Sequence, residues 1–198
     1  MDGNPSPQEY FRGVYQQSED PWNLASSEYE AEKYQTSLEA LPRQGYENAL
    51  EIGCSVGVFT ARLAARCGRL RAVDVAEAAL EKAKERCKSF SNVFFELMCL
   101  PEKYPNEVFD LTVLSEVGYY LSFEALRKLS AEITKHAQPS GHLMLVHWLA
   151  AVPGFELRGD DVHDHFLSLP EWHGAVSRRM NTYRIDVLEL RSDAPARL

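Results

Sequence analysis

The segment from Glu51 to Gly57 has the composition of a ligand-binding turn. It reads Glu-Ile-Gly-Cys-Ser-Val-Gly, and it stands between an apolar run and a stretch of helical periodicity. Glycines at a strand-to-helix turn let a ligand lie against bare backbone, and the start of the helix offers unpaired N–H donors. A dinucleotide site would need G-x-G-x-x-G, but Ser55 and Val58 occupy the second and third glycine positions. A nicotinamide cofactor is therefore not favoured.

A carboxylate follows this turn at the spacing expected of a nucleotide site. Asp74 ends an apolar run that begins at Leu70, and it stands 21 positions after Gly53. An acidic side chain there can accept hydrogen bonds from both hydroxyls of a ribose, although it can also cap the helix that begins near Glu77. The turn and the carboxylate together resemble the E-x-G-x-x-x-G loop and following acid of class I S-adenosylmethionine-dependent methyltransferases. The resemblance implies S-adenosyl-L-methionine as the cofactor.

The third apolar run departs from that pattern. It ends in Met98, Cys99 and Leu100, where these methyltransferases usually offer an aspartate to the adenine amino group. A thiol is a weak acceptor, so the backbone around Cys99 and Leu100 would have to contact the adenine edge. This departure keeps open an alternative in which the protein binds the cofactor without catalysis.

The fourth apolar run brings polar and aromatic groups to the same edge of a sheet. It ends in Ser115, Glu116 and Val117, and Tyr119 and Tyr120 follow. Ligands of open α/β sheets bind at the carboxyl ends of the strands. The two tyrosines are therefore either contacts to the adenosine or the acceptor, or ordinary core aromatics.

Six short segments resemble those of one particular group of these methyltransferases. They look like those of the nodulation protein S group of methyltransferases, and the similarity covers nearly the whole chain from about Asp20. That group is associated with N-methylation of the deacetylated glucosamine of chitooligosaccharides, so the resemblance implies a small-molecule acceptor with an amine, such as an amino sugar. The segments are Asp20 to Trp22, Ser27 to Glu30, the turn from Glu51, Leu114 to Leu121, Val146 to Trp148 and Gly159 to His163.

The methyltransferase interpretation assigns residues to two parts of one site. The cofactor is expected to contact Trp22, Tyr29, Lys33, Glu51, Gly53, Cys54, Ser55, Gly57, Asp74, Val75, Met98, Cys99, Leu100, Ser115, Glu116 and Val117. The acceptor is expected at Tyr119, Tyr120 and Trp148. In this interpretation Trp22 and Tyr29 cover the cofactor and Lys33 meets its carboxylate. The alternative is that Trp22 pins the N-terminal arm to the core and Lys33 is solvated.

Two histidines and a glutamate are candidates for the proton transfer that an amine acceptor requires. The sulfonium is already a good leaving group, so the enzyme mainly positions a neutral nucleophile, and an ammonium must first lose a proton. A histidine with a pKa of roughly 6.5 can receive it at neutral pH. We predict His147, His163 and Glu116 as catalytic residues, with packing or surface roles as the alternative for the histidines.

Acidic and histidine side chains also gather between Asp160 and His165. Such groups can bind metal ions. On one short helix they point in several directions, so we expect no metal site there.

Apolar runs that alternate with helical periods predict the scaffold of this site. Strands are predicted at Ala49–Gly53, Leu70–Val75, Val93–Met98, Phe109–Val117 and His142–Trp148, and helices at Ser27–Leu41, Val58–Cys67, Glu77–Lys88, Phe123–His136 and Asp160–Leu167. Two final runs, Ala175–Met180 and Tyr183–Arg191, fit an antiparallel hairpin. The predicted fold class is α/β: a Rossmann-like, doubly wound, mostly parallel seven-stranded sheet with a C-terminal antiparallel hairpin. Residues 1–26 form an N-terminal arm and 27–198 a single methyltransferase domain.

Composition limits the partners. With 21 basic and 29 acidic residues among 198, the chain has a net charge of −8, which repels phosphate backbones and anionic membranes. Neither nucleic acid nor a membrane is therefore an expected partner. The four cysteines lack C-x-x-C spacing and the N-terminus does not resemble a signal peptide, so we expect reduced thiols and a cytoplasmic protein. The sequence is interpreted as that of a methyltransferase that acts on an amine. The alternatives are an O-methyltransferase and a non-catalytic cofactor-binding protein. Whether the protein is a monomer or a homodimer is undetermined.

Overall fold

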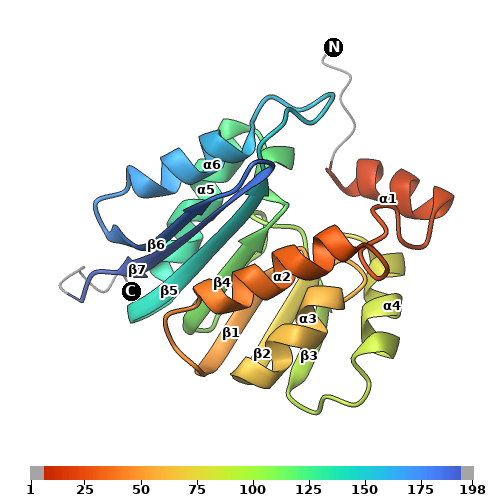
Figure 1. Ribbon diagram of the computed structural model, residues 1–198, viewed down its shortest axis with the longest axis horizontal. Coiled ribbons are helices and arrows are strands. Elements are labelled where there is room, and N and C mark those ends of the chain that lie inside the picture. Colours follow the sequence, from red (N-terminus) through yellow and green to blue (C-terminus); the bar gives the residue numbers. More distant parts are fainter. Residues whose placement is uncertain (1–6, 193–198) are drawn as a thin grey trace.

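One mixed sheet of seven strands forms the centre of the protein (Figure 1). The computed structural model describes residues 7–192, so the ends of the predicted arm (1–6) and domain (193–198) lie outside the described residues. The strands are β1 (Tyr46–Ile52), β2 (Cys67–Asp74), β3 (Val93–Leu97), β4 (Phe109–Ser115), β5 (Ala137–Trp148), β6 (Trp172–Arg179) and β7 (Tyr183–Leu190). Their order is β3-β2-β1-β4-β5-β7-β6, and only β7 runs antiparallel to its neighbours. The predicted fold class is confirmed.

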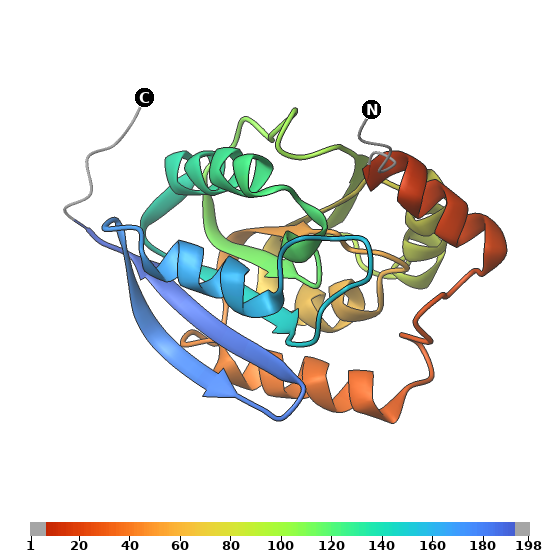
Figure 2. The same cartoon turned by 90° about the horizontal axis from the view of Figure 1, so that it is seen from above.

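Helices cover both faces of the sheet (Figure 2). They are α1 (Pro7–Gln17), α2 (Glu28–Ala40), α3 (Val58–Leu63), α4 (Glu77–Arg86), α5 (Phe123–Lys135) and α6 (Gly159–Leu167), with 3₁₀ turns at Ala64–Arg66 and Gly118–Tyr120. Ser27 caps α2, because its side chain accepts the Glu30 N–H. Helices α2 and α3 pack on one face, and α5 and α6 pack on the other.

Two apolar cores result from the alternation of side chains along the strands. In β5, Leu143 and Leu145 face the core under α5 and α6, whereas Met144 and Val146 face the core under α2 and α3. Successive residues of a strand point to opposite faces, and a strand covered on both faces reads as a continuous apolar run. The runs noted in the sequence are therefore central strands of the sheet.

Strand β5 begins earlier than predicted. It was predicted to start at His142, but it already includes Pro139 and Gly141, two residue types that normally interrupt regular structure. The pairing of β4 with β5 is irregular between Phe109 and Leu111, and Ser140 has a positive φ of 58°. A proline is tolerated at such an irregularity because no regular ladder hydrogen bond is needed there.

The N-terminal arm contains a helix that was not predicted. Helix α1 carries Tyr10, Phe11, Val14 and Tyr15, whose i, i+4 spacing places them on one side of the helix. Figure 1 shows α1 beyond the carboxyl ends of the central strands, apart from the two layers that cover the sheet. The sequence contained this periodicity, but the surrounding polar residues and prolines obscured it.

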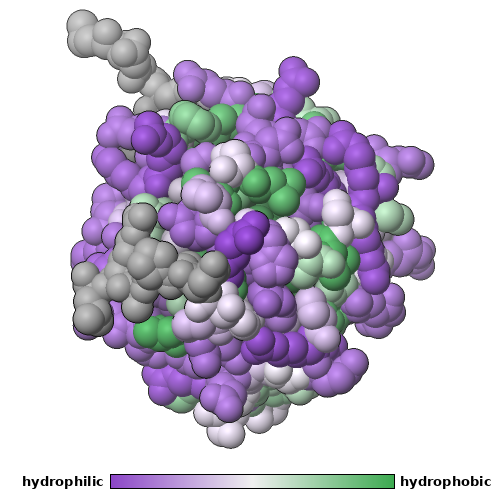
Figure 3. Space-filling model, turned by 90° about the vertical axis from the view of Figure 1, so that its left-hand side faces the viewer, coloured by the Kyte–Doolittle hydropathy of each residue, from purple (hydrophilic) through white to green (hydrophobic). Residues whose placement is uncertain are grey.

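Within residues 7–192, no helix combines the length and the apolar character that crossing a bilayer requires. Figure 3 shows that the side of the molecule seen there is mostly hydrophilic, with hydrophobic residues only in small separate patches. Scattered exposed apolar residues are normal on a protein surface.

Candidate functional site

A cavity of about 560 Å³ lies at the carboxyl ends of β1, β2 and β4. Strand β1 stands between β2 and β4, so the direction of winding reverses there, and ligands of open α/β sheets bind at such a point. The predicted cofactor and acceptor residues all line this cavity except Gly57. Of the predicted catalytic residues, Glu116 lines it, and His147 and His163 do not.

The turn after β1 approaches the segment after β4 very closely. Gly53 has a φ of 78°, and a Cβ at this position would lie 2.2 Å from Val117 Cγ2. Gly57 also has a positive φ, but a Cβ there would lie 2.8 Å from Ala83 Cα in α4. Gly57 therefore allows the start of α3 to pack on α4, and its contact with the cofactor stays a prediction.

Asp74 ties this turn to the end of β2. Its Oδ2 accepts the Ser55 N–H at 2.8 Å, and its Oδ1 accepts the Ala76 N–H at 2.9 Å. Burial raises the pKa of this carboxyl, while the N–H groups of Ala76 and Ser55 oppose the shift. The N-cap residue of α4 is Ala76, which offers no side-chain cap, so Asp74 bonds the backbone at the start of this helix without occupying its N-cap position.

Glu116 is the centre of an ionic network at the cavity. Its Oε1 accepts from Lys33 Nζ at 2.6 Å, and the same ammonium donates to Glu30 Oε1 at 2.9 Å. Its Oε2 accepts from Tyr119 Oη at 2.5 Å and from the Trp148 N–H at 3.0 Å. Burial by itself would lower the pKa of Lys33, but the two glutamates outweigh burial and raise it. This lysine is therefore an ammonium that is already held by two carboxylates.

The charged side chains that line the cavity are mostly acidic. They are Glu30, Glu51, Asp74 and Glu116, against one cation, Lys33. Glu51 is 3% exposed, and its Oε2 has no hydrogen-bond partner within residues 7–192. A cationic ligand would stabilise these carboxylates.

The wall formed by Met98, Cys99 and Leu100 lies beside Val75 in the cavity lining. The Cys99 thiol donates to Glu102 Oε2 at 3.3 Å. Burial raises the pKa of Cys99 to about 11, so the thiol keeps its proton. Cys99 therefore offers no anionic acceptor here, and the predicted contact of an adenine with this wall depends on the backbone.

The arm supplies aromatic side chains that the sequence interpretation missed. Tyr10, Phe11 and Tyr15 of α1 line the cavity. The rings of Tyr10 and Phe11 lie 5.8 and 4.8 Å from that of Tyr120, centroid to centroid, and Tyr15 Oη lies 2.6 Å from Ser55 Oγ. Helix α1 thus contacts both the turn after β1 and the segment after β4.

Three aromatic side chains predicted for the site are partly exposed. Trp22, Tyr29 and Trp148 line the cavity and are 39–40% exposed. Tyr29 is fixed from the far end of the chain, because its Oη lies 2.9 Å from Thr182 Oγ1 in the β6–β7 turn. These three side chains form the rim of the cavity.

His147 and His163 are fully buried behind the cavity. His147 Nε2 accepts the Gly118 N–H at 3.1 Å, and its Nδ1 lies 3.1 Å from His163 Nε2. Burial lowers the pKa of both histidines, and that of His147 falls well below 6.5. Neither ring faces an acceptor in the cavity, which corrects their prediction as direct proton acceptors.

The acidic residues near His163 are held by arginines. Arg184 Nη1 lies 3.1 Å from Asp160 Oδ1 and 2.9 Å from Asp164 Oδ1. Across residues 7–192, no three His, Cys, Asp or Glu side chains are grouped so that they could hold a metal ion. Asp160 and Asp164 therefore serve ion pairs, whereas Asp161 accepts the backbone N–H of Arg158 at the start of the helix.

The burial of Glu51 should make the free energy of unfolding of the ligand-free protein depend on pH. Burial raises its pKa to about 8, from 4.5 in an unfolded chain. Between these values the folded state binds more protons than the unfolded state, so the free energy of unfolding falls as pH rises. We expect a loss of about 1 kcal/mol per pH unit between pH 6.5 and 8, measured by urea unfolding. Glu51→Gln should flatten this slope, and equal slopes for variant and wild type would contradict the assignment.

Solved structures share this architecture. The N-methyltransferase NodS from Bradyrhizobium japonicum WM9, in complex with S-adenosyl-L-homocysteine, matches with a TM-score of 0.84 and 25% identity, over 94% of this chain and 99% of that one. A putative methyltransferase from Pseudomonas syringae matches with a TM-score of 0.71 and 30% identity, over 81% of this chain and 98% of that one. The chain therefore has the fold of these methyltransferases.

Sequence relatives identify the family. Residues 13–145 match the family model described as Nodulation protein S (NodS), and the chain belongs to this family. Nodulation protein S of Sinorhizobium fredii is 35% identical over 129 residues, which are 64% of this chain and 60% of that protein. Phosphoethanolamine N-methyltransferase 1 of Triticum aestivum is 30% identical over 114 residues, 54% of this chain and 22% of that protein. The matches thus span less than two thirds of these relatives.

Proposed function

We propose that the protein transfers the methyl group of S-adenosyl-L-methionine to the amino group of a small molecule. The excess of carboxylates in the cavity, four against one ammonium, is the observation that carries this proposal. The cofactor is a sulfonium with an ammonium, and an amine acceptor arrives protonated, so both ligands are cations. If the acceptor were a neutral alcohol, the cofactor would be the one cationic ligand, and the additional carboxylates would have no second cation to bind.

The cavity residues fit the cofactor. Asp74 would hold the ribose hydroxyls, and the bare backbone at Gly53 would let the ligand lie close to the turn. Glu51 Oε2, buried without a partner among the described residues, suits the cofactor's ammonium. The bound cofactor supplies an electrophilic methyl group on sulfur.

Glu116 is the residue proposed to accept the proton of the acceptor's ammonium. Its carboxylate lies in the cavity and is oriented by Lys33, Tyr119 and the backbone of Trp148. A fixed carboxylate can bind an ammonium, take a proton from it and leave the nitrogen lone pair free to attack. This assignment needs no contribution from a histidine in the cavity.

The acceptor is proposed to be an amino sugar or a deacetylated chitooligosaccharide. Relatives named for methylation of nitrogen, NodS and phosphoethanolamine N-methyltransferase, support an amine. The partly exposed aromatic side chains of the rim provide flat apolar surfaces beside the acidic groups. Such surfaces suit a sugar ring, which has apolar faces between its hydroxyls.

The test is transfer of a labelled methyl group from S-adenosyl-L-methionine to matched acceptors. Glucosamine oligomers and their N-acetylated counterparts carry the same hydroxyls and differ in the free amine. We expect label only in the free amines, on nitrogen by NMR. Equal labelling of both acceptors would overturn N-methylation and indicate an O-methyltransferase. Tight binding of S-adenosyl-L-homocysteine without labelling of these or other small amines would favour the non-catalytic alternative.

A further inference from the structure

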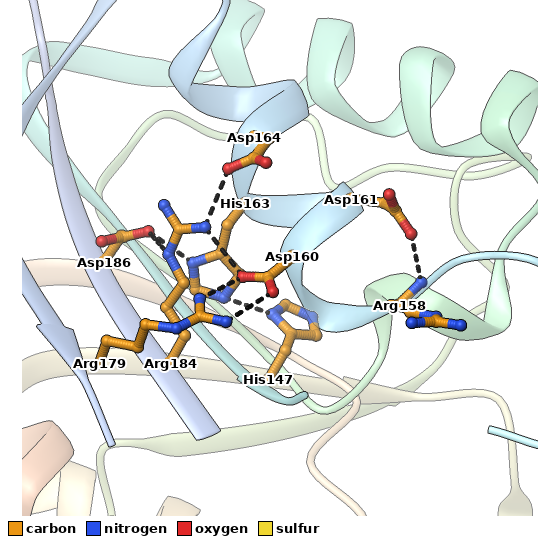
Figure 4. A network of polar contacts seen from close by, with 9 residues as sticks. All are labelled: His147, Arg158, Asp160, Asp161, His163, Asp164, Arg179, Arg184 and Asp186. Atoms are coloured by element: carbon orange, nitrogen blue, oxygen red, sulfur yellow. Dashed lines mark hydrogen bonds and ion pairs between the residues drawn. The ribbon is translucent and has the colours of Figure 1, made fainter. Parts of the chain in front are cut away.

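A buried chain of polar contacts runs from the C-terminal hairpin through His163 to His147 (Figure 4), and from His147 to the cavity segment 116–120. Asp186 Oδ2 lies 2.7 Å from His163 Nδ1, and His163 Nε2 lies 3.1 Å from His147 Nδ1. His147 Nε2 then accepts the N–H of Gly118 at 3.1 Å. His147, His163 and Asp186 are at most 1% exposed, so water does not replace these contacts. The three residues are called the relay below.

The contacts allow only one arrangement of protons. The Gly118 N–H is a donor, so His147 Nε2 must be unprotonated and its Nδ1 must carry the proton. His163 then receives that hydrogen bond on Nε2 and donates from Nδ1 to the Asp186 carboxylate. A proton added to either ring would place two N–H groups against each other. Both imidazoles are therefore neutral, which agrees with the pKa values lowered by burial.

The outer end of the relay is anchored by ion pairs. Arg184 Nε lies 2.7 Å from Asp186 Oδ2, and Arg184 Nη1 pairs with Asp164 at 2.9 Å. Arg184 belongs to β7 and Asp164 to α6. Figure 4 shows the side chains from α6 and the hairpin converging on this point. The charge of Asp186 is thereby held in place and compensated.

The inner end of the relay fixes the segment that carries Glu116. A Cβ on Gly118 would lie 2.6 Å from Val162 Cγ1 and 3.0 Å from His147 Nε2, so the backbone lies directly against β5 and α6. The N–H of Trp148, the residue after His147, donates to Glu116 Oε2. Glu116 itself has a positive φ of 57°, a conformation that costs energy unless its surroundings hold it.

We propose that His147, with His163 and Asp186 behind it, is a positioning residue that holds segment 116–120 in the conformation needed for methyl transfer. It acts through the Gly118 N–H and touches neither cofactor nor acceptor. This inference rests on the proposed function for its kinetic consequence. Its structural consequence, the order of segment 116–120, is independent of any acceptor.

Two substitutions at one position separate this role from general stability. Glutamine is long enough to place an acceptor near the position of Nε2, whereas asparagine can reach His163 but not Gly118. We expect His147→Asn to lower kcat about tenfold and to raise amide exchange of residues 116–120 about tenfold, with S-adenosyl-L-homocysteine affinity changed less than about threefold. His147→Gln should recover most of both losses.

The matched control is His142→Asn, five residues earlier in the same strand. His142 is also buried, its Nδ1 lies 3.0 Å from Tyr46 Oη and its Nε2 lies 3.5 Å from Glu189 Oε2. Asparagine again keeps a polar group near Nδ1 and removes Nε2, but here away from the cavity. We expect its kcat and its exchange at 116–120 to match wild type. Equal behaviour of folded His147→Asn and His142→Asn, or no recovery by His147→Gln, would overturn the positioning role.

A measurement on the wild-type protein decides the inference if the variants do not fold. The ¹⁵N shifts of the imidazoles should show His147 protonated at Nδ1 and unprotonated at Nε2, unchanged between pH 6 and 8. Protonation at Nε2 would overturn the relay. If wild type methylates no amine but His147→Asn still loosens segment 116–120, the proposed function fails and the relay stands.

Discussion

Glu116→Gln is expected to lower kcat with an amine acceptor by about 100-fold, within the range that a positioned general base contributes. Glutamine keeps the size of the side chain and can still accept from Tyr119 and from the Trp148 N–H, so segment 116–120 should keep its shape. It cannot take a proton from an ammonium, and it removes one of the two negative partners of Lys33. Steady-state kinetics with saturating cofactor would measure the change, and calorimetry with S-adenosyl-L-homocysteine should find an affinity within about threefold of wild type, since the expected loss lies in the chemical step.

The control for Glu116 is the other glutamate on the same lysine. Glu30→Gln removes an equal charge from Lys33, but Glu30 contacts neither Tyr119 nor Trp148 among the interactions of the described residues. We expect its kcat to fall less than about tenfold, because it alters the field at Glu116 without removing the base. Equal losses in the two variants would show that only the charge of the network matters, and the assignment of Glu116 as proton acceptor would fail.

The central sheet could be predicted from the sequence because each buried strand is a local apolar run. Residues Leu111 to Leu114 and Leu143 to Val146 show this directly, and both lie in central strands. The beginning of β5 could not be predicted in this way, since Pro139 and Gly141 normally interrupt regular structure. Only the irregular pairing with β4 explains their place in a strand.

The site was predictable where one short segment carries its chemistry, and less so where distant segments meet. The turn from Glu51 and the carboxylate of Asp74 could be placed by spacing alone. The orientation of His147 could not, because whether its ring faces the cavity or α6 depends on where α6 packs. Nothing local to Tyr15 indicates its contact with Ser55, 40 positions along the chain. Long-range packing therefore decided which candidates line the cavity.

Asp74→Ala should weaken binding of S-adenosyl-L-homocysteine by at least about 100-fold. A carboxylate that accepts two ribose hydroxyls loses two charged hydrogen bonds, each worth about 1.5–3 kcal/mol, and about 1.4 kcal/mol corresponds to a factor of ten in affinity. The variant also frees the N–H groups of Ser55 and Ala76, so the turn after β1 loses part of its order. Isothermal titration calorimetry on the folded variant measures the effect.

A second buried aspartate separates these two contributions. Asp110 also accepts two backbone N–H groups, from Glu47 at 2.8 Å and Asn48 at 2.9 Å, but it lies at the opposite end of the strands from the cavity. Asp110→Ala should lower the free energy of unfolding by a similar amount, about 1–3 kcal/mol for each N–H left unpaired, with unchanged cofactor affinity. Near-normal affinity in folded Asp74→Ala would remove Asp74 from the ribose site, because a carboxylate that only orders the turn would behave as Asp110 does.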